Sequence, residues 1–327
     1  MNIKPVGPAA IPNLGLGTFQ MPEWETRDIV AAAFAEGYRH IDTAQAYGNE
    51  AGVGAGVRAA DVPRDKIFLT TKILPEHFAA DDFRTAAERS LATLETDYVD
   101  LLLLHWPSRT VPLSETLPVL DALIAEGKVR FGGVSNFTIE QLKESESILQ
   151  APLAANQIEF HPFIYQSKLL ADMGARGIPF EAYAPLAQGA VMEDDTLTEI
   201  ANVHGTTAAA ISVAWLLAKP LGIAIPKTAK ASRLAGNLAA AEITLSAEEI
   251  ARISLRLKKR SVLRRVFEAV ERSAESSSGK VRQQTLTHST ANDGYPPKTA
   301  IRALSHHRNS VGLPLPMRRL QTTNRIA

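Results

Sequence analysis

The chain has 327 residues, of which 45% are hydrophobic and none is cysteine. This length is enough for one large domain with a well-filled core, and the lack of cysteine excludes disulfides, thiolate catalysis and Cys-ligated metals. We expect no metal site. The first residues lack the apolar segment of a signal peptide, and no run of 18 or more apolar residues occurs. We therefore expect a cytoplasmic protein with no membrane span.

The net charge of zero hides two unequal parts. Residues 255–327 hold 15 Lys+Arg and 4 Asp+Glu, so residues 1–254 hold the other 20 basic and 31 acidic residues. An acidic body and a basic tail need separate interpretations. For the acidic body we expect no nucleic-acid partner.

Residues 1–254 alternate between short apolar runs and helical stretches. The runs predict eight strands, at 14–17, 40–43, 67–72, 99–105, 129–135, 155–159, 179–183 and 223–226. The clearest helical stretches are 26–36, 50–60, 81–93, 114–126, 138–147 and 207–218. Several strand runs are continuously apolar, which is typical of strands covered on both faces. Repeated strand–helix units predict an α/β fold, a closed parallel (β/α)8 TIM barrel.

Four polar residues lie at or just after the ends of strand-like runs: Asp42, Tyr47, Lys72 and His105. In a parallel barrel the carboxyl ends of the strands meet on one face, so these side chains should meet in space. Reducing a carbonyl needs a proton donor, and a free tyrosine, with a pKa of about 10, is a weak one. An ammonium at Lys72, held by Asp42, would lower the pKa of Tyr47, while His105 could orient a carbonyl oxygen.

Each of these residues also has a plainer interpretation. Tyr47 could be a packing residue, Lys72 a solvated strand end, His105 a core histidine and Asp42 a turn residue. Their joint placement at strand ends favours the catalytic interpretation. Two Gly-x-Gly pairs, 15–17 and 52–54, lack a third glycine in register, so they are weak signals of a Rossmann motif. We expect Gly15 and Gly17 at close-packed barrel positions, and Gly52 and Gly54 as residues of a helix.

Five blocks of sequence, in order, resemble the signatures of the aldo-keto reductase superfamily. They are residues 37–50, Leu104-His105-Trp106-Pro107, Gly133-Val134-Ser135-Asn136-Phe137, Asn156-Gln157-Ile158-Glu159 and Ile225-Pro226-Lys227-Thr228. The resemblance covers about residues 11–254. It implies a TIM barrel that binds NADPH without a Rossmann domain, with Tyr47 as proton donor, Lys72 and Asp42 as its tuners and His105 as the group that orients the carbonyl.

The resemblance also implies cofactor contacts. Ser135, Asn136 and Gln157 would bind the nicotinamide carboxamide, and Tyr183 would stack on the nicotinamide ring. Without the family, Gln157 could equally be a polar strand end. Residues 184–188 resemble the loop along the pyrophosphate. The other implied cofactor positions are Thr18, Pro185, Leu186, Gln188, Ile225, Pro226 and Asn237.

Two cations and a hydroxyl, Lys227, Arg233 and Thr228, follow the last predicted strand. A 2′-phosphate suits such a set, which favours NADPH over NADH; the alternative is a solvated basic loop. Gly236 departs from the acidic residue that the family often places near the adenine, which leaves that adenine contact open.

The expected carbonyl pocket contains Phe19, Trp106 and His105, although Phe19 and Trp106 could also be rim packing residues. The short N-terminus and loops resemble bacterial 2,5-diketo-D-gluconate reductases, a group that also reduces methylglyoxal. His77 stands in a loop where the family often has an aromatic residue, so the substrate preference stays open. We expect a monomer that acts on a small carbonyl substrate. The alternative is a cofactor-binding regulatory subunit with this fold, like the β-subunits of potassium channels.

The tail, residues 255–327, departs from the family, whose members end soon after the position of Leu255 in a segment that closes the substrate pocket. Residues 255–272 have apolar residues at helical spacing, and the Ser-, Arg- and Pro-rich remainder predicts disorder. Either the tail is a basic extension that binds nucleic acid or an anionic membrane, or a reading-frame error has replaced the original C-terminus. The abrupt change of composition favours the second interpretation, and with it weak substrate binding.

Overall fold

The computed structural model describes residues 3–164 and 166–256. The chain divides into two compact units, Met1–Arg265 and Val266–Ala327, and every described residue belongs to the first. The expectations for the tail from residue 257 onward lie outside the described residues.

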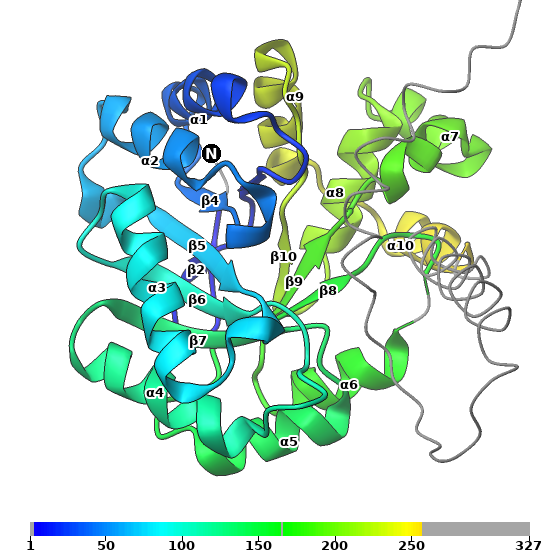
Figure 1. The fold of residues 1–327 in the computed structure, drawn as a ribbon. Helices are drawn as coiled ribbons and strands as arrows, with labels where there is room; N and C mark the ends of the chain where they lie inside the picture. The colour runs from blue at the N-terminus through cyan, green and yellow to red at the C-terminus, as the bar shows by residue number, and fades with distance from the viewer. Residues whose placement is uncertain (1–2, 165, 257–327) are drawn as a thin grey trace, which may run out of the picture. The chain divides into compact units, whose positions relative to one another are not determined.

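Eight parallel strands form one sheet in which neighbours in sequence are neighbours in space (Figure 1). They are β3 (Leu16–Gly17), β4 (His40–Asp42), β5 (Phe68–Ile73), β6 (Val99–Leu104), β7 (Val129–Ser135), β8 (Asn156–Glu159), β9 (Phe180–Tyr183) and β10 (Gly222–Ala224). Parallel bridges from Leu14 to Ala224 and from Gly17 to Lys227 join the first strand to the last. The predicted (β/α)8 barrel is confirmed, with every predicted strand present.

Helices follow the strands and lie around the outside of the sheet (Figure 1). The six predicted helices are present as α1 (Glu23–Glu36), α2 (Glu50–Ala59), α3 (Ala80–Leu94), α4 (Leu113–Ala125), α5 (Ile139–Ile148) and α8 (Ala208–Leu217). Four further helices lie outside those six clearest stretches: α6 (Ser167–Ala175), α7 (Asp195–Val203), α9 (Leu234–Ala239) and α10 (Ala247–Ser254). The start of α10 had a readable signal, because Ser246 and Glu249 form a capping box.

A short antiparallel hairpin precedes the barrel, with strands β1 (Pro5–Val6) and β2 (Ile11–Pro12). Ile11 is fully buried and packs with Phe68, Leu101 and Ile223 from the barrel strands. These apolar side chains fill the N-terminal end of the barrel. The polar strand ends are therefore gathered at the opposite, C-terminal end, where barrel chemistry takes place.

Helix α8 is the most apolar helix described, and its apolar side chains are buried against the rest of the barrel. Trp215 is fully buried and its ring stacks on Phe160 with centroids 5.4 Å apart.

Within the described part of the chain, no single helix is long and apolar enough to cross a membrane. The pair α7 and α8 meets that test only together, and it is bent by 88°.

Glycines occur where the barrel leaves no room for a side chain. A Cβ on Gly15 would lie 2.6 Å from Nδ1 of His40, and one on Gly17 would lie 2.8 Å from the carbonyl oxygen of Ile225. In α2, a Cβ on Gly54 would collide with the backbone oxygen of Leu94 at the end of α3. The predicted close packing of Gly15 and Gly17 is confirmed, and Gly52 and Gly54 lie in a helix, α2, as predicted.

The substitution Gly54→Ala should therefore destabilise the barrel, because two helix backbones must separate to admit one methyl group. We expect a loss of about 1–3 kcal/mol in the free energy of unfolding. Gly174→Ala in α6 is the matched control, because a Cβ there meets nothing within 4 Å, and it should stabilise by about 0.4–1 kcal/mol. Urea unfolding measures both, and similar values for the two variants would contradict this account of α2 packing.

Candidate active site

The predicted acid, phenol and amine meet at the C-terminal end of the barrel. Nζ of Lys72 donates to Oδ1 of Asp42 at 2.7 Å, to the carbonyl oxygen of Thr43 at 2.8 Å and to the hydroxyl of Tyr47 at 3.1 Å. The side chains of Lys72 and Asp42 are 0% and 2% exposed. All three donors of the ammonium are used, so its position is fixed.

Tyr47 reaches this site through a short turn that is anchored on both sides. It ends the 3₁₀ helix Gln45–Tyr47, which follows β4 and closes at Gly48 with a φ of 65°. Nε2 of Gln45 donates to the carbonyl oxygen of Ala86 in α3 at 2.8 Å. The side-chain amide of Asn49 donates to two backbone oxygens near the end of β3 and accepts from the hydroxyl of Thr43. The turn is thus tied to strands and a helix around it.

The electrostatics of the site agree only in part with the expectation from sequence. Burial opposes the charge on Lys72, but Asp42 and Tyr47 outweigh it and raise the pKa of Lys72. Burial raises the pKa of Tyr47, and although Lys72 pulls that pKa down, the net direction is upward. The expected net lowering was wrong, because sequence does not show how far the phenol is removed from water. The resting tyrosine is therefore protonated.

His105 stands next to the phenol. Its ring centroid is 5.8 Å from that of Tyr47, with the rings nearly perpendicular. Burial, and after it the charge of Lys72, lowers the pKa of His105 well below its usual range, so the imidazole is neutral. Its Nδ1 is buried and has no hydrogen-bond partner among the described residues. A neutral imidazole keeps one N–H donor, which is what orienting a carbonyl oxygen requires.

Of the two aromatic residues expected beside the substrate, Phe19 lies against the catalytic phenol. Phe19 is 38% exposed, and its ring centroid is 5.0 Å from that of Tyr47. Trp106, directly after His105, is half-buried. The structure thus brings Phe19 to the phenol and leaves part of its face accessible.

The residues expected at the nicotinamide form a hydrogen-bonded cluster beside His105. Asn136 directly follows β7 and has a left-handed backbone, with a φ of 65°. Its Nδ2 donates to the carbonyl oxygen of His105 and to Oγ of Ser135. Its Oδ1 accepts from the hydroxyl of Tyr183 at 2.9 Å. Ser135 in turn donates to the carbonyl oxygen of Gln157. The side chains of Ser135 and Asn136 therefore already bond to protein groups.

Gln157 is the buried member of this cluster whose amide bonds to two carboxyl groups. Its Nε2 donates to Oδ2 of Asp42 at 2.8 Å and to Oε2 of Glu181 at 3.0 Å. Both amide protons are taken by carboxyl groups, which leaves the carbonyl oxygen Oε1 as the atom that can accept from a ligand. A nicotinamide carboxamide, which carries an N–H₂ donor, fits that requirement.

The loop expected along a pyrophosphate follows β9. Ala184, Ala187, Gln188 and Gly189 have positive φ values, so the backbone turns sharply there. The carbonyl oxygen of Pro185 accepts from Oγ of Ser212 at 2.7 Å, which fixes the loop to α8. Along the loop Leu186 is half-buried and Gln188 is exposed.

The segment after β10 holds the expected adenine-end residues. Ile225, Pro226 and Thr228 are buried, Asn237 is half-buried, and Lys227 and Arg233 are exposed. The hydroxyl of Thr228 bonds to the backbone of Lys230, and that of Thr18 donates to the carbonyl oxygen of Asp42 at 3.0 Å. These two hydroxyls thus hold strand ends in place, while the two cations face solvent and suit a phosphate.

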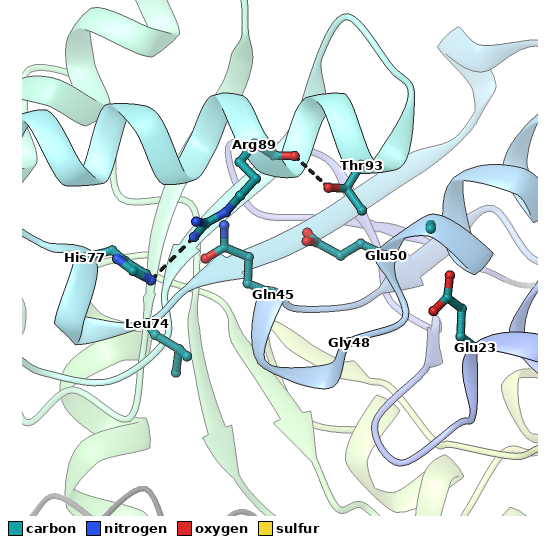
Figure 2. Close-up of a pocket in the computed structure, with 9 residues that line it drawn as sticks. Glu23, Gln45, Gly48, Glu50, Leu74, His77, Arg89 and Thr93 are labelled. Atoms are coloured by element: carbon teal, nitrogen blue, oxygen red, sulfur yellow. Dashed lines mark hydrogen bonds between the residues drawn. The ribbon is translucent and has the colours of Figure 1, made fainter.

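A separate cavity of about 380 Å³ lies behind the turn that carries Tyr47 (Figure 2). It is lined by residues of that turn and of the first turns after β3, β4 and β5, with α3 on one side: Glu23, Gln45, Gly48, Glu50, Ala51, Leu74, His77, Arg89 and Thr93. His77, considered above as a residue that affects substrate preference, lines this cavity and contacts Arg89, with the nitrogens 3.4 Å apart. The residues Asp42, Tyr47, Lys72 and His105 do not line it.

Sequence reasoning missed two supporting groups. The carbonyl oxygen of Thr43 is one of the three acceptors of Lys72, and a backbone contact has no sequence signal. Glu181, fully buried in β9, shares the amide of Gln157 with Asp42. Its signal was a charged residue in the middle of an otherwise apolar strand run.

Replacing Lys72 by methionine should destabilise the barrel strongly, because Asp42 would keep its buried charge without a cation. Breaking a buried pair in this way costs about 3–5 kcal/mol. The double variant Asp42→Asn/Lys72→Met removes both charges and should cost less than the sum of the two single substitutions. A urea-unfolding double-mutant cycle measures this. Additive losses would show that the two groups do not depend on each other.

The comparisons with known proteins agree with this geometry. Residues 13–255 match the Aldo/keto reductase family. The chain is 36% identical over 244 residues to the glyoxal reductase of Bacillus subtilis (strain 168), covering 74% of this chain and 88% of that protein. It is 38% identical over 243 residues to methylglyoxal reductase DkgB of Escherichia coli O157:H7, covering 73% and 91%. A crystal structure of a putative 2,5-diketo-D-gluconic acid reductase B superimposes with a TM-score of 0.78 at 40% identity, covering 79% and 93%. The chain belongs to the aldo/keto reductase family and is an oxidoreductase.

Proposed function

We propose that this chain reduces small aldehydes and ketones to alcohols with NADPH, and that Tyr47 is the proton donor. The observation that carries the proposal is the Lys72 ammonium, fixed between Asp42 and the hydroxyl of Tyr47 at 2.7 and 3.1 Å. A phenol beside a buried cation can release its proton as negative charge develops on it. The neutral imidazole of His105 also lies next to the phenol, with ring centroids 5.8 Å apart.

A bound nicotinamide cofactor supplies the hydride for the carbonyl carbon. Tyr47 gives its proton to the carbonyl oxygen, and Lys72 stabilises the phenolate that remains. Asp42 keeps Lys72 charged and in place. His105 donates its N–H to the carbonyl oxygen and so directs that oxygen toward the tyrosine. Because burial keeps Tyr47 protonated at rest, the cation acts mainly during proton transfer.

The substrates we propose are small dicarbonyl compounds such as methylglyoxal, and 2,5-diketo-D-gluconate. The support is the printed function of the similar proteins, a methylglyoxal reductase and a putative 2,5-diketo-D-gluconic acid reductase. The preference for NADPH is supported by the exposed cations Lys227 and Arg233 after β10, since a 2′-phosphate binds best to a guanidinium.

The direct test is NADPH oxidation, followed by absorbance, with methylglyoxal, glyoxal and 2,5-diketo-D-gluconate as substrates. Turnover with a dicarbonyl supports the proposal. NADPH binding without turnover on any of them would support the alternative, a regulatory subunit that keeps the fold.

We also propose that the protein is a cytoplasmic monomer. Size-exclusion chromatography would check the oligomeric state, and cell fractionation would check the location.

Tyr47→Phe removes the proton of the proposed acid and keeps the ring that packs on Phe19. We expect kcat to fall by about 10²-fold or more, since general acid catalysis contributes about 10²–10⁴. The dissociation constant of NADPH, measured by fluorescence quenching, should be nearly unchanged. A variant that retained most of its kcat would remove Tyr47 from the mechanism.

Arg233→Ala should weaken NADPH much more than NADH, because only NADPH has the 2′-phosphate. A hydrogen bond to a charged group contributes about 1.5–3 kcal/mol, which corresponds to more than a tenfold change in affinity. Arg252→Ala is the control, because Arg252 is an exposed arginine in α10 that pairs with Glu199. Equal losses for the two cofactors in Arg233→Ala would assign Arg233 a structural role.

A further inference from the structure

A chain of polar contacts continues below the catalytic group into the middle of the barrel. Asp42 and Glu181 both accept from Nε2 of Gln157, at 2.8 and 3.0 Å. The other carboxyl oxygen of Glu181, Oε1, lies 3.3 Å from Nε2 of His40. The side chains of Glu181 and His40 are both 0% exposed. The chain joins β4, β8 and β9 in a layer that water does not reach.

The proton positions in this layer follow from the partners of His40. Its Nδ1 is 3.2 Å from the carbonyl oxygen of Pro12. A carbonyl can only accept, so Nδ1 carries the proton. Burial lowers the pKa of His40 to about 4, so the ring is neutral and its Nε2 is an acceptor. Glu181 and the hydroxyl of Thr70, also 3.3 Å away, are the groups that can donate to it.

Glu181 can donate only as a carboxylic acid. Burial, and next the charge of Asp42, raises the pKa of Glu181 to about 8. An ionised Glu181 would put a second negative charge beside Asp42 and leave Oε1 against the lone pair of Nε2. Oε1 is buried and accepts no hydrogen bond from any described group, as expected if it carries a proton. A neutral acid removes both conflicts, with its O–H toward His40 and its carbonyl oxygen toward Gln157.

We propose that Glu181 is a positioning residue of the active site, which as a neutral carboxylic acid holds the amide of Gln157 with its nitrogen toward Asp42 and its carbonyl oxygen toward the cofactor pocket. The cofactor end of this inference rests on the proposed function. An amide can rotate by half a turn at little cost when its surroundings permit, and two acceptors on one side forbid that rotation here. Glu181 touches neither substrate nor cofactor, so it acts through Gln157.

Two substitutions separate this role from a purely structural one. Glu181→Gln copies the neutral acid, because its amide N–H can donate to His40 and its carbonyl oxygen can accept from Gln157. Glu181→Leu keeps a similar volume and removes both functions. We expect Glu181→Gln to keep wild-type kcat and NADPH affinity at pH 7. We expect Glu181→Leu to weaken NADPH about tenfold and to lower kcat, which is the loss that about 1.4 kcal/mol produces.

The pH dependence of stability tests the protonation state directly. The titratable groups that act on Glu181 come from other strands of the barrel: His40 and Asp42 from β4, Lys72 from β5, and Tyr47 from the turn after β4. In the unfolded chain the pKa of Glu181 has its ordinary value of 4.5, and in the fold burial raises it to about 8. Between these values unfolding releases its proton, so the stability that the neutral acid contributes is lost as the pH rises. The thermal midpoint of the wild type should fall relative to that of Glu181→Gln between pH 5 and pH 8, and the difference should then level off.

Asp100→Asn is the matched control. Asp100 is also 0% exposed, but it pairs with Arg64 at 2.8 Å and Arg130 at 2.9 Å, so a neutral amide should lower its thermal midpoint clearly. A carboxylic-acid carbonyl band in the infrared spectrum, present in the wild type and lost in Glu181→Gln, gives a second measurement of the protonation state.

The outcomes are distinct. If the wild type binds NADPH but reduces no carbonyl, the proposed function fails. The pH profiles of stability and the infrared band still test whether Glu181 is a neutral acid. If Glu181→Gln loses activity as Glu181→Leu does, or if the wild-type and Glu181→Gln profiles are parallel, Glu181 is an anion and the inference is wrong. If Glu181→Leu does not fold, Glu181→Gln and the infrared band decide alone.

Discussion

A positive charge without exposed surface, that of Lys72, organises this active site. An ammonium in a water-free place must find an acceptor for each of its protons, and the three acceptors of Lys72 come from the end of β4, from the residue after it and from the 3₁₀ turn that follows. Only a chain that pairs β4 with β5 in the observed register and closes that turn places all three together. The position of Tyr47 is thus a consequence of satisfying Lys72.

The interior of the barrel changes in character along its axis. The N-terminal end is apolar, filled by Ile11 and its neighbours; the middle is polar, with His40, Gln157 and Glu181; and the C-terminal end holds the Lys72–Asp42 pair. The pair is almost completely buried, and this exclusion of water strengthens the attraction between its two charges. The polar middle layer supplies the hydrogen bonds that Asp42 still needs. The chemistry is therefore confined to one end of the barrel.

Much of this arrangement is readable from sequence, because polar residues at the ends of apolar runs have few structural explanations in a parallel barrel. Asp42, Tyr47 and Lys72 were predicted to meet, and they do. Strands of two residues, such as β1 and β2, are too short to show the alternation of apolar and polar residues that predicts a strand. The six-residue helix α9 is likewise almost too short to show a helical repeat. The direction of the Tyr47 pKa shift was wrong because it depends on burial, which a strand-end position does not specify. Glu181 could be seen as unusual in its strand, but its partners lie 24 and 141 residues away in sequence.

Three buried carboxyl groups in this barrel show how partners decide charge. Asp100 accepts from Arg64 and Arg130, and Asp42 accepts from Lys72, so each has a cation within hydrogen-bonding distance. Glu181 has only an amide and a neutral imidazole. Since a buried charge without a counter-charge is costly, the first two are placed to be anions and the third to be an acid. One amide, that of Gln157, lies between an anion and an acid, and this asymmetry lets Asp42 hold its charge for Lys72 without repulsion from below.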